Sequence, residues 1–568
     1  MHLVPLPRDL HMFRALRLAL GLVLLASTPA LAQRGGGGGR AGGPPAPDPF
    51  PTVIPADDAH MIALKAEAVR LVDSLSTLTQ QMVDQVFSFG ELGFTEVETS
   101  RYLTGVLEKN GFTVQRGFAG VPTGWIARWG SGKPVIALGS DIDGIPKASQ
   151  KPGVAYHDPI VQGAPGHGEG HNSGVPLNVT AALALKQIMI KEKIPGTIMV
   201  WPGVAEEQMA AKAYFVRAGM FKDVDAVLFT HVASTMGVTW GESGAAALIS
   251  VAFDFQGKSS HAAGAPWAGR SALDAAELMD VAWQFRREHL PLTQRSHSVI
   301  VDGGDQPNVV PQNATDWYYF RETSTPKVKA LFALGDTMAR AAAMMTSTSV
   351  ANVRILGSGW SGHFSKPIAE AMGENIRKVP TPAWSEEDQQ LAKALQCEIG
   401  VRQTGLTTTQ SAGTSGTLLE STTGGGSDDI GDVSWNLPTI TLTYPANIPG
   451  LPGHNWTDGI AMATPIAHKG TTAGAKVQAM TMLDLYLKPT ILTQAWKYFT
   501  DIQTKDIKYE PLMKPTDNPA TFLNQGILAR YRPEMQKYYY DPTKYKTYLE
   551  QLGIKYPTVR ACPQTGAP

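Results

Sequence analysis

The chain has 568 residues, of which 43% are hydrophobic and 17% are charged, and its formal net charge at pH 7 is −1. This length predicts more than one domain, and the balanced charge excludes a global electrostatic field for binding nucleic acid or an anionic membrane. The two cysteines, Cys397 and Cys562, are too few for a thiolate metal site or a disulfide-rich scaffold. In an oxidising compartment they could pair with each other, and the sequence leaves this open.

The N-terminal residues are typical of a targeting segment followed by a linker. Two arginines precede an apolar run at 18–26, and an Ala-Leu-Ala cleavage pattern follows at 30–32. We therefore expect a signal peptide over 1–32, because the apolar run is too short for a membrane anchor. A flexible Gly- and Pro-rich linker is expected over 33–56. The mature protein is then secreted or periplasmic, with no membrane span after signal cleavage.

Residues 57–244 alternate between helix and strand patterns, which predicts the first part of an α/β domain. Apolar residues at helical spacing predict helices over 57–85, 95–111 and 175–191. Continuous apolar runs predict buried strands over 134–139, 196–201 and 226–230. Such an alternation favours an open sheet with helices packed against it.

Each of these expected strands is followed by side chains of the kinds that bind metals. They are Asp141 and Asp143, Glu206 and Glu207, and His231. One carboxylate after a strand is usually a helix cap, but capping does not explain ligand-type residues after every strand. Because ligands of open α/β sheets bind beyond the carboxyl ends of the strands, these residues predict one binding site.

The segment 163–174 places His167, Glu169 and His171 in alternation with glycines. The glycines disfavour a helix and allow the backbone to come close to a ligand. In an extended segment, residues two apart point to the same side, and imidazole and carboxylate are metal-ligand groups. The segment therefore predicts a metal-binding loop, and the alternative is a Gly-rich surface loop that binds nothing.

The pattern changes at residue 245, where a β-α-β-β-α-β order begins and continues to residue 355. Strands are expected over 246–255, 296–301, 315–320 and 350–356, and helices over 269–288 and 326–345. This order is typical of a split βαβ arrangement, and it predicts an inserted second domain. It carries His261, Asn308 and Arg321. Considered alone, His261 would cap a helix and Arg321 would form a surface ion pair.

The first domain is expected to resume over 356–487, although the stretch 356–420 has no clear element pattern. A strand is expected over 438–443, with His454 beyond its end, and a final helix over 457–487. Residues 488–568 are rich in Tyr, Lys and Pro and are expected to form a C-terminal extension without catalytic motifs.

Taken in order, these motifs resemble the di-metal aminoacylase/carboxypeptidase (amidohydrolase) family of metallopeptidases. They are Ser-Asp-Ile-Asp-Gly-Ile-Pro at 140–146, Gly-His-Gly-Glu-Gly-His-Asn at 166–172, Ala-Glu-Glu at 205–207, Thr-His at 230–231 and Pro-Gly-His at 452–454. The stretches at 257–262, 307–311 and 431–435 are similar to its p-aminobenzoyl-glutamate hydrolase branch. The resemblance implies an α/β, zinc-peptidase-like catalytic domain, a mixed sheet flanked by helices, with an inserted ferredoxin-like α+β lid or dimerisation domain.

The resemblance also implies a site for two divalent metal ions, Zn²⁺ or Mn²⁺. Its ligands would be Glu169, His171, Glu207, His231 and His454, supported by His167 and Asp143. Glu169 stands where the family's amidohydrolases have cysteine, and Asn172 stands where they have aspartate. A carboxylate is a harder ligand than a thiolate, which favours Mn²⁺ and leaves the identity of the metal open.

Catalytic and substrate-binding roles follow from the same resemblance. Glu206 matches the general base, which takes a proton from metal-activated water and passes it to the leaving amine. His261 matches a donor to the developing oxyanion, often across a dimer interface. Asn308 matches a substrate-contacting residue, and Arg321 matches the arginine that clamps the substrate's carboxylate.

We therefore expect a secreted, metal-dependent amidohydrolase that cleaves the amide of N-acyl or N-aroyl amino acids, such as p-aminobenzoyl-glutamate. The expected partners are a small-molecule substrate and further copies of the chain, as a homodimer or larger homo-oligomer through the inserted domain, and no nucleic acid. One alternative is a dipeptidase or carboxypeptidase on the same scaffold. Others are a silent metal-dependent binding protein and an interaction protein that works through residues 488–568.

Overall fold

The structure is a computed structural model that describes residues 50–243, 245–409, 413–416 and 425–562. The expected signal peptide and the expected linker up to residue 49 lie outside these residues. All elements below belong to one compact unit, Thr52–Pro568. Over the described part of the chain, no helix has the length and apolar character needed to cross a membrane.

The larger of two sheets has nine strands, in the order β1-β2-β4-β3-β5-β13-β6-β11, and β12 pairs with β6. Strands β4, β3, β5 and β13 run parallel to one another, whereas β2 and β6 join them antiparallel on either side. The predicted mixed sheet is therefore confirmed. Its strands are β1 Thr113–Arg116, β2 Trp125–Ser131, β3 Val135–Asp141, β4 Gly196–Gly203, β5 Ala226–Ala233, β6 Gly237–Glu242, β11 His363–Phe364, β12 Thr414–Gly416 and β13 Thr439–Pro445.

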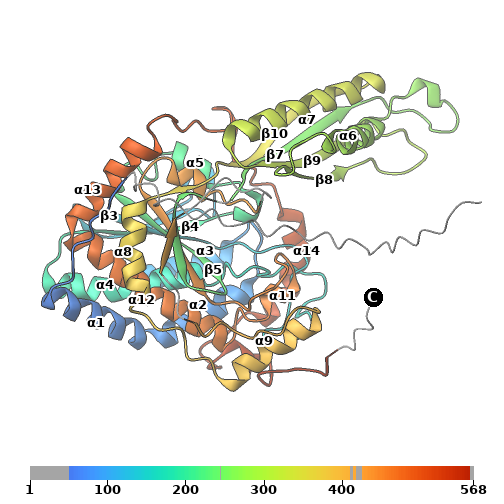
Figure 1. The fold of residues 1–568 in the computed structure, drawn as a ribbon. Helices are drawn as coiled ribbons and strands as arrows, with labels where there is room; N and C mark the ends of the chain where they lie inside the picture. Colours follow the sequence, from blue (N-terminus) through green and yellow to red (C-terminus); the bar gives the residue numbers. More distant parts are fainter. Residues whose placement is uncertain (1–49, 244, 410–412, 417–424, 563–568) are drawn as a thin grey trace, which may run out of the picture. The chain divides into compact units, whose positions relative to one another are not determined.

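Helices pack against this sheet (Figure 1). Helices α4 and α12 pack against each other and against central strands, and most of their residues are buried, as expected of helices that are largely apolar all round. The helices outside the inserted region are α1 Ala59–Ser74, α2 Ser76–Phe89, α3 Val97–Lys109, α4 Gly174–Glu192, α5 Lys212–Arg217, α8 Lys366–Ile376, α9 Glu386–Glu398, α10 Ile430–Ser434, α11 Trp456–Gly459, α12 Pro465–Leu487, α13 Pro489–Tyr498, α14 Gln525–Met535 and α15 Tyr548–Gln551.

Two helices predicted as continuous are each interrupted. The one expected over 57–85 is divided into α1 and α2 at Leu75, whose φ of −93° and ψ of 2° leave the helical region. The one expected over 457–487 is divided into α11 and α12. There Pro465 occupies the first turn of α12, and the side chain of Thr464 caps it, a combination that starts a new helix.

The smaller sheet has four antiparallel strands in the order β10-β7-β9-β8. Helices α6 and α7 pack against each other and against this sheet, around a hydrophobic core of its own that includes Phe253, Trp283 and Phe320. This arrangement confirms the predicted split βαβ order and the ferredoxin-like fold. The elements are β7 Ala247–Gln256, α6 Ala272–Arg287, β8 Arg295–Asp302, β9 Asn313–Glu322, α7 Thr325–Met345 and β10 Ser349–Gly359.

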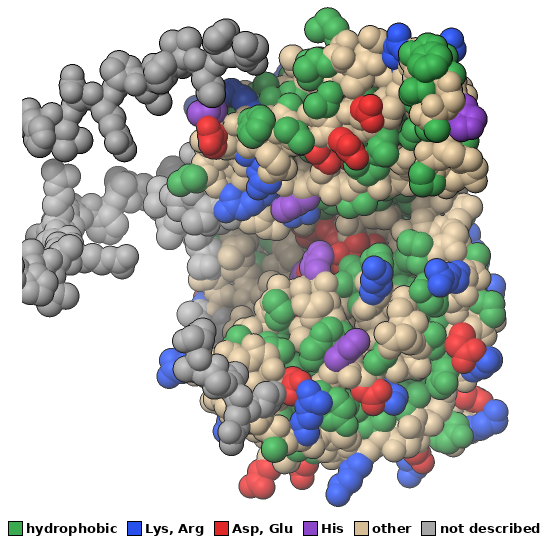
Figure 2. All heavy atoms as spheres, turned by 90° about the vertical axis from the view of Figure 1, so that its right-hand side faces the viewer, with side chains coloured by type: hydrophobic (Ala, Val, Ile, Leu, Met, Phe, Trp, Pro, Cys, Tyr) green, Lys and Arg blue, Asp and Glu red, His purple; other side chains and the backbone are tan. Residues whose placement is uncertain are grey.

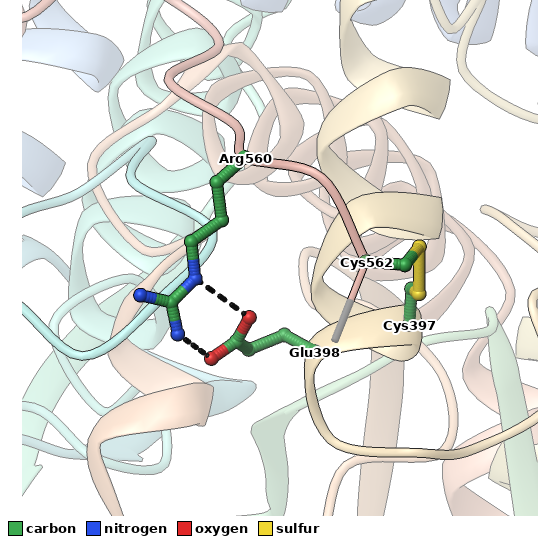
Figure 3. Close-up of a disulfide and its surroundings, with 4 residues drawn as sticks. All are labelled: Cys397, Glu398, Arg560 and Cys562. Atoms are coloured by element: carbon green, nitrogen blue, oxygen red, sulfur yellow. Dashed lines mark hydrogen bonds and ion pairs between the residues drawn. A yellow bond between two sulfur atoms is a disulfide. The ribbon is translucent and has the colours of Figure 1, made fainter. Parts of the chain in front are cut away.

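The C-terminal segment after α12 packs into the fold built around the larger sheet. Tyr540 and Tyr548 are buried in its hydrophobic core, and the side chain of Arg532 donates to the fully buried carboxylate of Glu91 at 2.9 Å. Cys562 forms a disulfide with Cys397 of α9, next to an ion pair between Arg560 and Glu398 (Figure 3). The pairing that the sequence left open is thus present in the structure.

Candidate metal centre and active site

The carboxyl ends of the parallel strands deliver their polar side chains to one place. Strand β3 ends at Asp141, and β4 leads into a short 3-10 turn, Glu206–Gln208. His231 lies in β5, and the loop after β13 carries His454. This is the edge at which ligands of open α/β sheets bind.

Glu169 lies at the centre of the five residues predicted as metal ligands. Its carboxylate oxygens are 3.4 Å from Nε2 of His171 and 3.5 Å from Nε2 of His231. Nε2 of His454 is also 3.4 Å from this carboxylate. Glu207 completes the cluster, with its oxygens 3.8 Å from Nδ1 of His171 and 3.5 Å from Nδ1 of His454. All five residues therefore meet within one chain.

These separations fit residues that share a cation. Ligands at about 2.1 Å from a tetrahedral ion lie about 3.4 Å apart, which is close to most of the distances in the cluster. Both ring nitrogens of His171 and Oδ1 of Asp143 are buried without a hydrogen-bond partner among the described residues, although buried polar atoms are normally paired. The donor set of imidazoles and carboxylates thus fits a divalent metal centre.

The carboxylates also raise the affinity of the imidazoles for protons. Burial opposes the protonation of His171, but the surrounding carboxylates, Asp143 and Glu169 first among them, raise its pKa well above the usual value. The carboxylate of Glu169 raises the pKa of His454 to about 9. Burial raises the pKa of Glu207 to about 8. Metal ions compete with protons for such groups, so a cluster that attracts protons this strongly also attracts cations.

Neighbouring groups hold the ligand side chains in orientation. Nδ1 of His231 lies 2.9 Å from the carbonyl oxygen of Val232, and a bond donated there leaves Nε2 free to bind. Oδ2 of Asp143 accepts from the backbone N–H of Glu207 at 3.1 Å. Nε2 of His167 lies 3.1 Å from the carbonyl oxygen of Val86, and burial lowers the pKa of this imidazole to about 4. His167 and Asp143 thus border the cluster, as their sequence positions predict.

The backbone is strained where the cluster is presented. Ala205 and Met209, which flank the turn that carries Glu206, both have a left-handed conformation with φ of 51° and 53°. His454 has φ of 51° as well. Each such residue costs about 1 kcal/mol or more, and residues of this kind concentrate at functional sites.

Glu206 lies beside the cluster, and its Oε2 is 4.0 Å from Nε2 of His171. Burial, followed by the charges of Asp141 and Asp428, raises the pKa of Glu206 well above its usual value. Its carboxylate also lies within 4.8 Å of those of Asp428 and Asp429. The residue is thus placed next to the residues predicted as metal ligands, in surroundings that favour its taking up a proton.

Lys212 is a fully buried cation that the sequence did not single out. Its Nζ donates to Oδ1 of Asp141 at 2.6 Å and to Oδ1 of Asp429. A Cβ at Gly203 would lie 1.8 Å from Oδ1 of Asp141, so only glycine fits where β4 passes this pair. A lone lysine in an apolar stretch carries no motif, and Asp428 and Asp429 lie in a Gly/Ser-rich loop, so no specific pattern in the sequence marks these residues.

The smaller sheet brings Arg321 to the cluster through strand β9. The hydroxyl of Tyr319 donates to the backbone carbonyl of Glu207 at 3.4 Å, and the guanidinium of Arg321 lies 5.5 Å from the Tyr319 ring centre. Burial lowers the pKa of Arg321, and the charges of Tyr319 and Glu206 oppose that shift. Nε of Arg321 is buried without a partner among the described residues. A guanidinium whose Nε has no partner among the described residues therefore lies within electrostatic reach of Glu206.

His261 and Asn308 lie together, but not at the cluster. The backbone N–H of Ala262 donates to the carbonyl of Asn308 at 3.0 Å, and His261 forms a β-bridge with Val309. The side chains of His261 and Asn308 are both exposed. Within the described ranges, neither residue has a hydrogen bond or an ion pair with the five ligand-type residues.

A cavity of about 570 Å³ opens beside Glu169 and His231. Figure 2 shows a hollow on one face of the molecule with histidine and acidic side chains inside it. A substrate of small-molecule size has room next to the cluster.

Comparisons with known proteins agree with this architecture. Residues 241–343 match the family model described as the peptidase dimerisation domain. The chain is 32% identical over 454 residues to one of the subunits of p-aminobenzoyl-glutamate hydrolase from Escherichia coli K12, covering 75% of this chain and 94% of that protein. The chain belongs to the M20 family of peptidases.

Two further similar proteins also match this chain over most of its length. Xaa-Arg dipeptidase of Mus musculus is 28% identical and covers 78% of this M20 peptidase and 93% of its own length. A solved structure named as an aminohydrolase, from methicillin-resistant Staphylococcus aureus, has a TM-score of 0.53 at 17% identity and covers 74% of this chain and 100% of that one, which supports the fold. The predicted family is confirmed, and this M20 peptidase is a hydrolase of amide bonds.

Proposed function

We propose that this chain is a metal-dependent amidohydrolase that cleaves N-acyl amino acids, with N-aroyl amino acids such as p-aminobenzoyl-glutamate as the preferred class. The meeting of five metal-ligand side chains with Glu206 and the unpaired guanidinium of Arg321 carries this proposal. The name of the relative in Escherichia coli, which is part of a p-aminobenzoyl-glutamate hydrolase, supports the substrate class.

Two divalent ions would be held by the five clustered residues. Those residues are Glu169, His171, Glu207, His231 and His454. When bound, a divalent cation supplies a Lewis acid that polarises the amide carbonyl and lowers the pKa of water to about 7. The mixture of imidazole and carboxylate ligands suits Zn²⁺ or Mn²⁺.

Glu206 would act as the general base. It is buried beside the ligands, and its surroundings raise the affinity of its carboxylate for a proton. It accepts a proton from the attacking water and donates it to the amine nitrogen as the amide C–N bond breaks. One carboxyl group thereby serves both proton transfers.

Arg321 would bind the free carboxylate of the amino acid. Its guanidinium is held against the ring of Tyr319, and its Nε has no partner among the described residues. The guanidinium fork matches a carboxylate in geometry and charge. This contact fixes the scissile amide relative to Glu206.

The inserted domain would join a second copy of the chain, which supplies His261 and Asn308 to the site. Strand β8 is an edge strand of its sheet, and it exposes 62% of Val299 and 53% of Val301. Phe285 on α6 is 73% exposed. An edge strand with exposed apolar side chains is suited to pairing with another chain. His261 then donates a hydrogen bond to the carbonyl oxygen on which negative charge develops.

We also propose that the protein works outside the cytoplasm. The N-terminal sequence pattern supports secretion, and so does the disulfide between Cys397 and Cys562, because disulfides persist in oxidising compartments.

The test is hydrolysis of p-aminobenzoyl-glutamate, other N-acyl amino acids and Xaa-Arg dipeptides by metal-stripped and Zn²⁺- or Mn²⁺-reloaded protein. We expect activity only after reloading, and we expect Glu206→Gln to lower kcat by about 10²–10⁴-fold with unchanged metal content. Preferred cleavage of the dipeptides would favour a dipeptidase, as the name of the mouse relative suggests. Metal binding without turnover of any amide would instead indicate a binding protein.

A further inference from the structure

The cavity beside Glu169 and His231 is lined by both polar and apolar residues. Strands β6 and β13 and the loop 426–430 form much of its wall. Phe364 and Val238 contribute apolar surface, whereas Thr441 and Asp428 contribute a hydroxyl and a carboxylate. Because the cavity includes two of the metal-ligand side chains, a group that fills it would be attached directly to the scissile amide.

We propose that this cavity is the acyl-group subsite, and that Asp428 and Thr441 select acyl groups that carry an N–H donor, such as an aromatic amine. This inference rests on the proposed amidohydrolase function. It goes further by assigning which half of the substrate enters the cavity and which chemical group the cavity recognises.

The charge of the wall determines which half of the substrate enters. No Lys or Arg is among the described residues that line the cavity, and Asp428 adds a negative charge there. The free carboxylate of an N-acyl amino acid would be desolvated and repelled in these surroundings. The unpaired guanidinium of Arg321 is outside the cavity lining and provides the carboxylate with a partner. The acyl half is therefore the half that fits the cavity.

The hydroxyl groups of the wall indicate what the acyl group carries. The side-chain oxygens of Thr414, Ser427 and Thr441 are buried and have no hydrogen-bond partner among the described residues. Thr443 lines the same wall two residues further along β13, but its hydroxyl already donates to the carbonyl of Gly237 at 3.1 Å. Buried polar atoms without a partner are costly, and a donor group on a ligand that packs against this wall would pair them. A purely apolar acyl group cannot do so.

Asp428 provides the acceptor for a donor group. One of its oxygens accepts from the backbone N–H of Ile430 at 2.8 Å. Lys212 lies 3.7 Å away, but it already donates to Asp141 and Asp429. The second oxygen of Asp428 makes no hydrogen bond with any described residue, and the side chain is 22% exposed. A hydrogen bond from an amine N–H to this carboxylate would be charge-assisted and correspondingly strong.

The test compares p-aminobenzoyl-glutamate with benzoyl-glutamate, which differs only in lacking the amine. For the wild-type enzyme we expect kcat/KM to favour the amine by on the order of a hundredfold. Thr441→Val and Asp428→Asn should each reduce this preference to below about tenfold, whereas Thr443→Val should leave the ratio unchanged. A wild-type ratio near one, or a ratio that neither variant changes, would overturn the inference and leave the proposed function standing.

A binding measurement separates this inference from the proposed function. Calorimetric titration of the protein with p-aminobenzamide and with benzamide needs no turnover. We expect the amine-bearing compound to bind at least about tenfold more tightly, and we expect Thr441→Val to remove the difference. Tighter binding of p-aminobenzamide without hydrolysis of either glutamate conjugate would contradict only the proposed function. Equal binding of the two amides would contradict the subsite.

Discussion

The two sheets bring their predicted site residues together to different degrees. In the larger sheet, residues as distant in sequence as Glu169 and His454 approach to 3.4 Å. In the smaller sheet, Arg321 lies near the cluster, whereas His261 and Asn308 do not. Parallel strands share one carboxyl edge, so their ends must converge. An antiparallel sheet directs successive loops to opposite ends, so its loops cannot all face one site.

The register of the smaller sheet explains this separation. Arg321 pairs with Leu248 near the start of β7, close to the larger sheet, whereas Asn313 pairs with Gln256 at the other end. The distance from Leu248 to Gln256 along an extended strand is about 27 Å. His261 follows that far end, and Asn308 precedes Asn313. The proposed site, which uses both ends of this sheet, would therefore require a second copy of the chain.

The sharpest test of the difference between the sheets is a mixed dimer. Glu206→Gln and His261→Ala should each lower kcat by about a hundredfold or more. A dimer with one copy of each, isolated with two affinity tags, should recover about half of the wild-type activity, because one of its two sites has both residues intact. No recovery would mean that His261 acts in its own chain or not at all. A monomeric protein in sedimentation analysis would contradict the dimer itself.

A smaller loss of activity is expected when Arg321 is replaced. Arg321→Ala should lower kcat/KM for p-aminobenzoyl-glutamate by about 10–100-fold, since it removes a charge-assisted contact with the substrate. It should have much less effect on the corresponding substrate with an amidated α-carboxyl group. Arg354→Ala is a matched control in the same sheet, because Arg354 pairs with Asp254 in an ion pair. Equal losses with both substrates would show that Arg321 does not bind the carboxylate.

The smallest effects concern stability, where the two regions should respond to pH in opposite directions. In the larger sheet, burial lowers the pKa of His363 to about 4. As the pH falls below about 6.5, His363 therefore takes up a proton in the unfolded protein before it does so in the folded protein, and the folded protein loses stability. In the smaller sheet, burial and the nearby Asp280 raise the pKa of Asp316 to about 8. The contribution of Asp316 to the free energy of unfolding is complete below about pH 4. It is lost as the pH rises toward the folded-state pKa of Asp316.

Hydrogen exchange, corrected for intrinsic rates, can follow β11 and β9 separately across this pH range. His363→Gln should reduce the loss of protection in β11 at low pH, and Asp316→Asn should reduce the loss in β9 at high pH. The exposed His289 provides a control, His289→Gln, that should change neither. If protection changed in the same way with pH in β11 and in β9, the assignment of these effects to His363 and Asp316 would be contradicted.

Much of the site was predictable because its residues follow general rules of position. Glu207 follows a buried strand and His231 lies near the end of another, and the alternation with glycine marks Glu169 and His171. Lys212 was not predictable, since only the folded chain brings Asp141 and Asp429 to it.

Some features of the fold could likewise be predicted from the sequence, and others could not. Hydrophobic periodicity, together with family motifs, predicts the order of helices and strands around both sheets. The break at Leu75 has no Pro or Gly to mark it, so packing rather than local sequence sets it. Residues 488–568 carry no motif that places them, and their burial in the core depends on contacts with distant segments.

The pairing of Arg532 with Glu91 sets a limit on when folding can finish during synthesis. The two residues are 441 positions apart, and Glu91 would otherwise remain buried without its cationic partner. At ribosomal rates this interval takes roughly 20 to 90 seconds. During that time the nascent chain has made its whole inserted domain but cannot close the core that Tyr540 and Tyr548 complete. The larger sheet therefore completes its core only after the C-terminal segment has been made, later than the smaller sheet can.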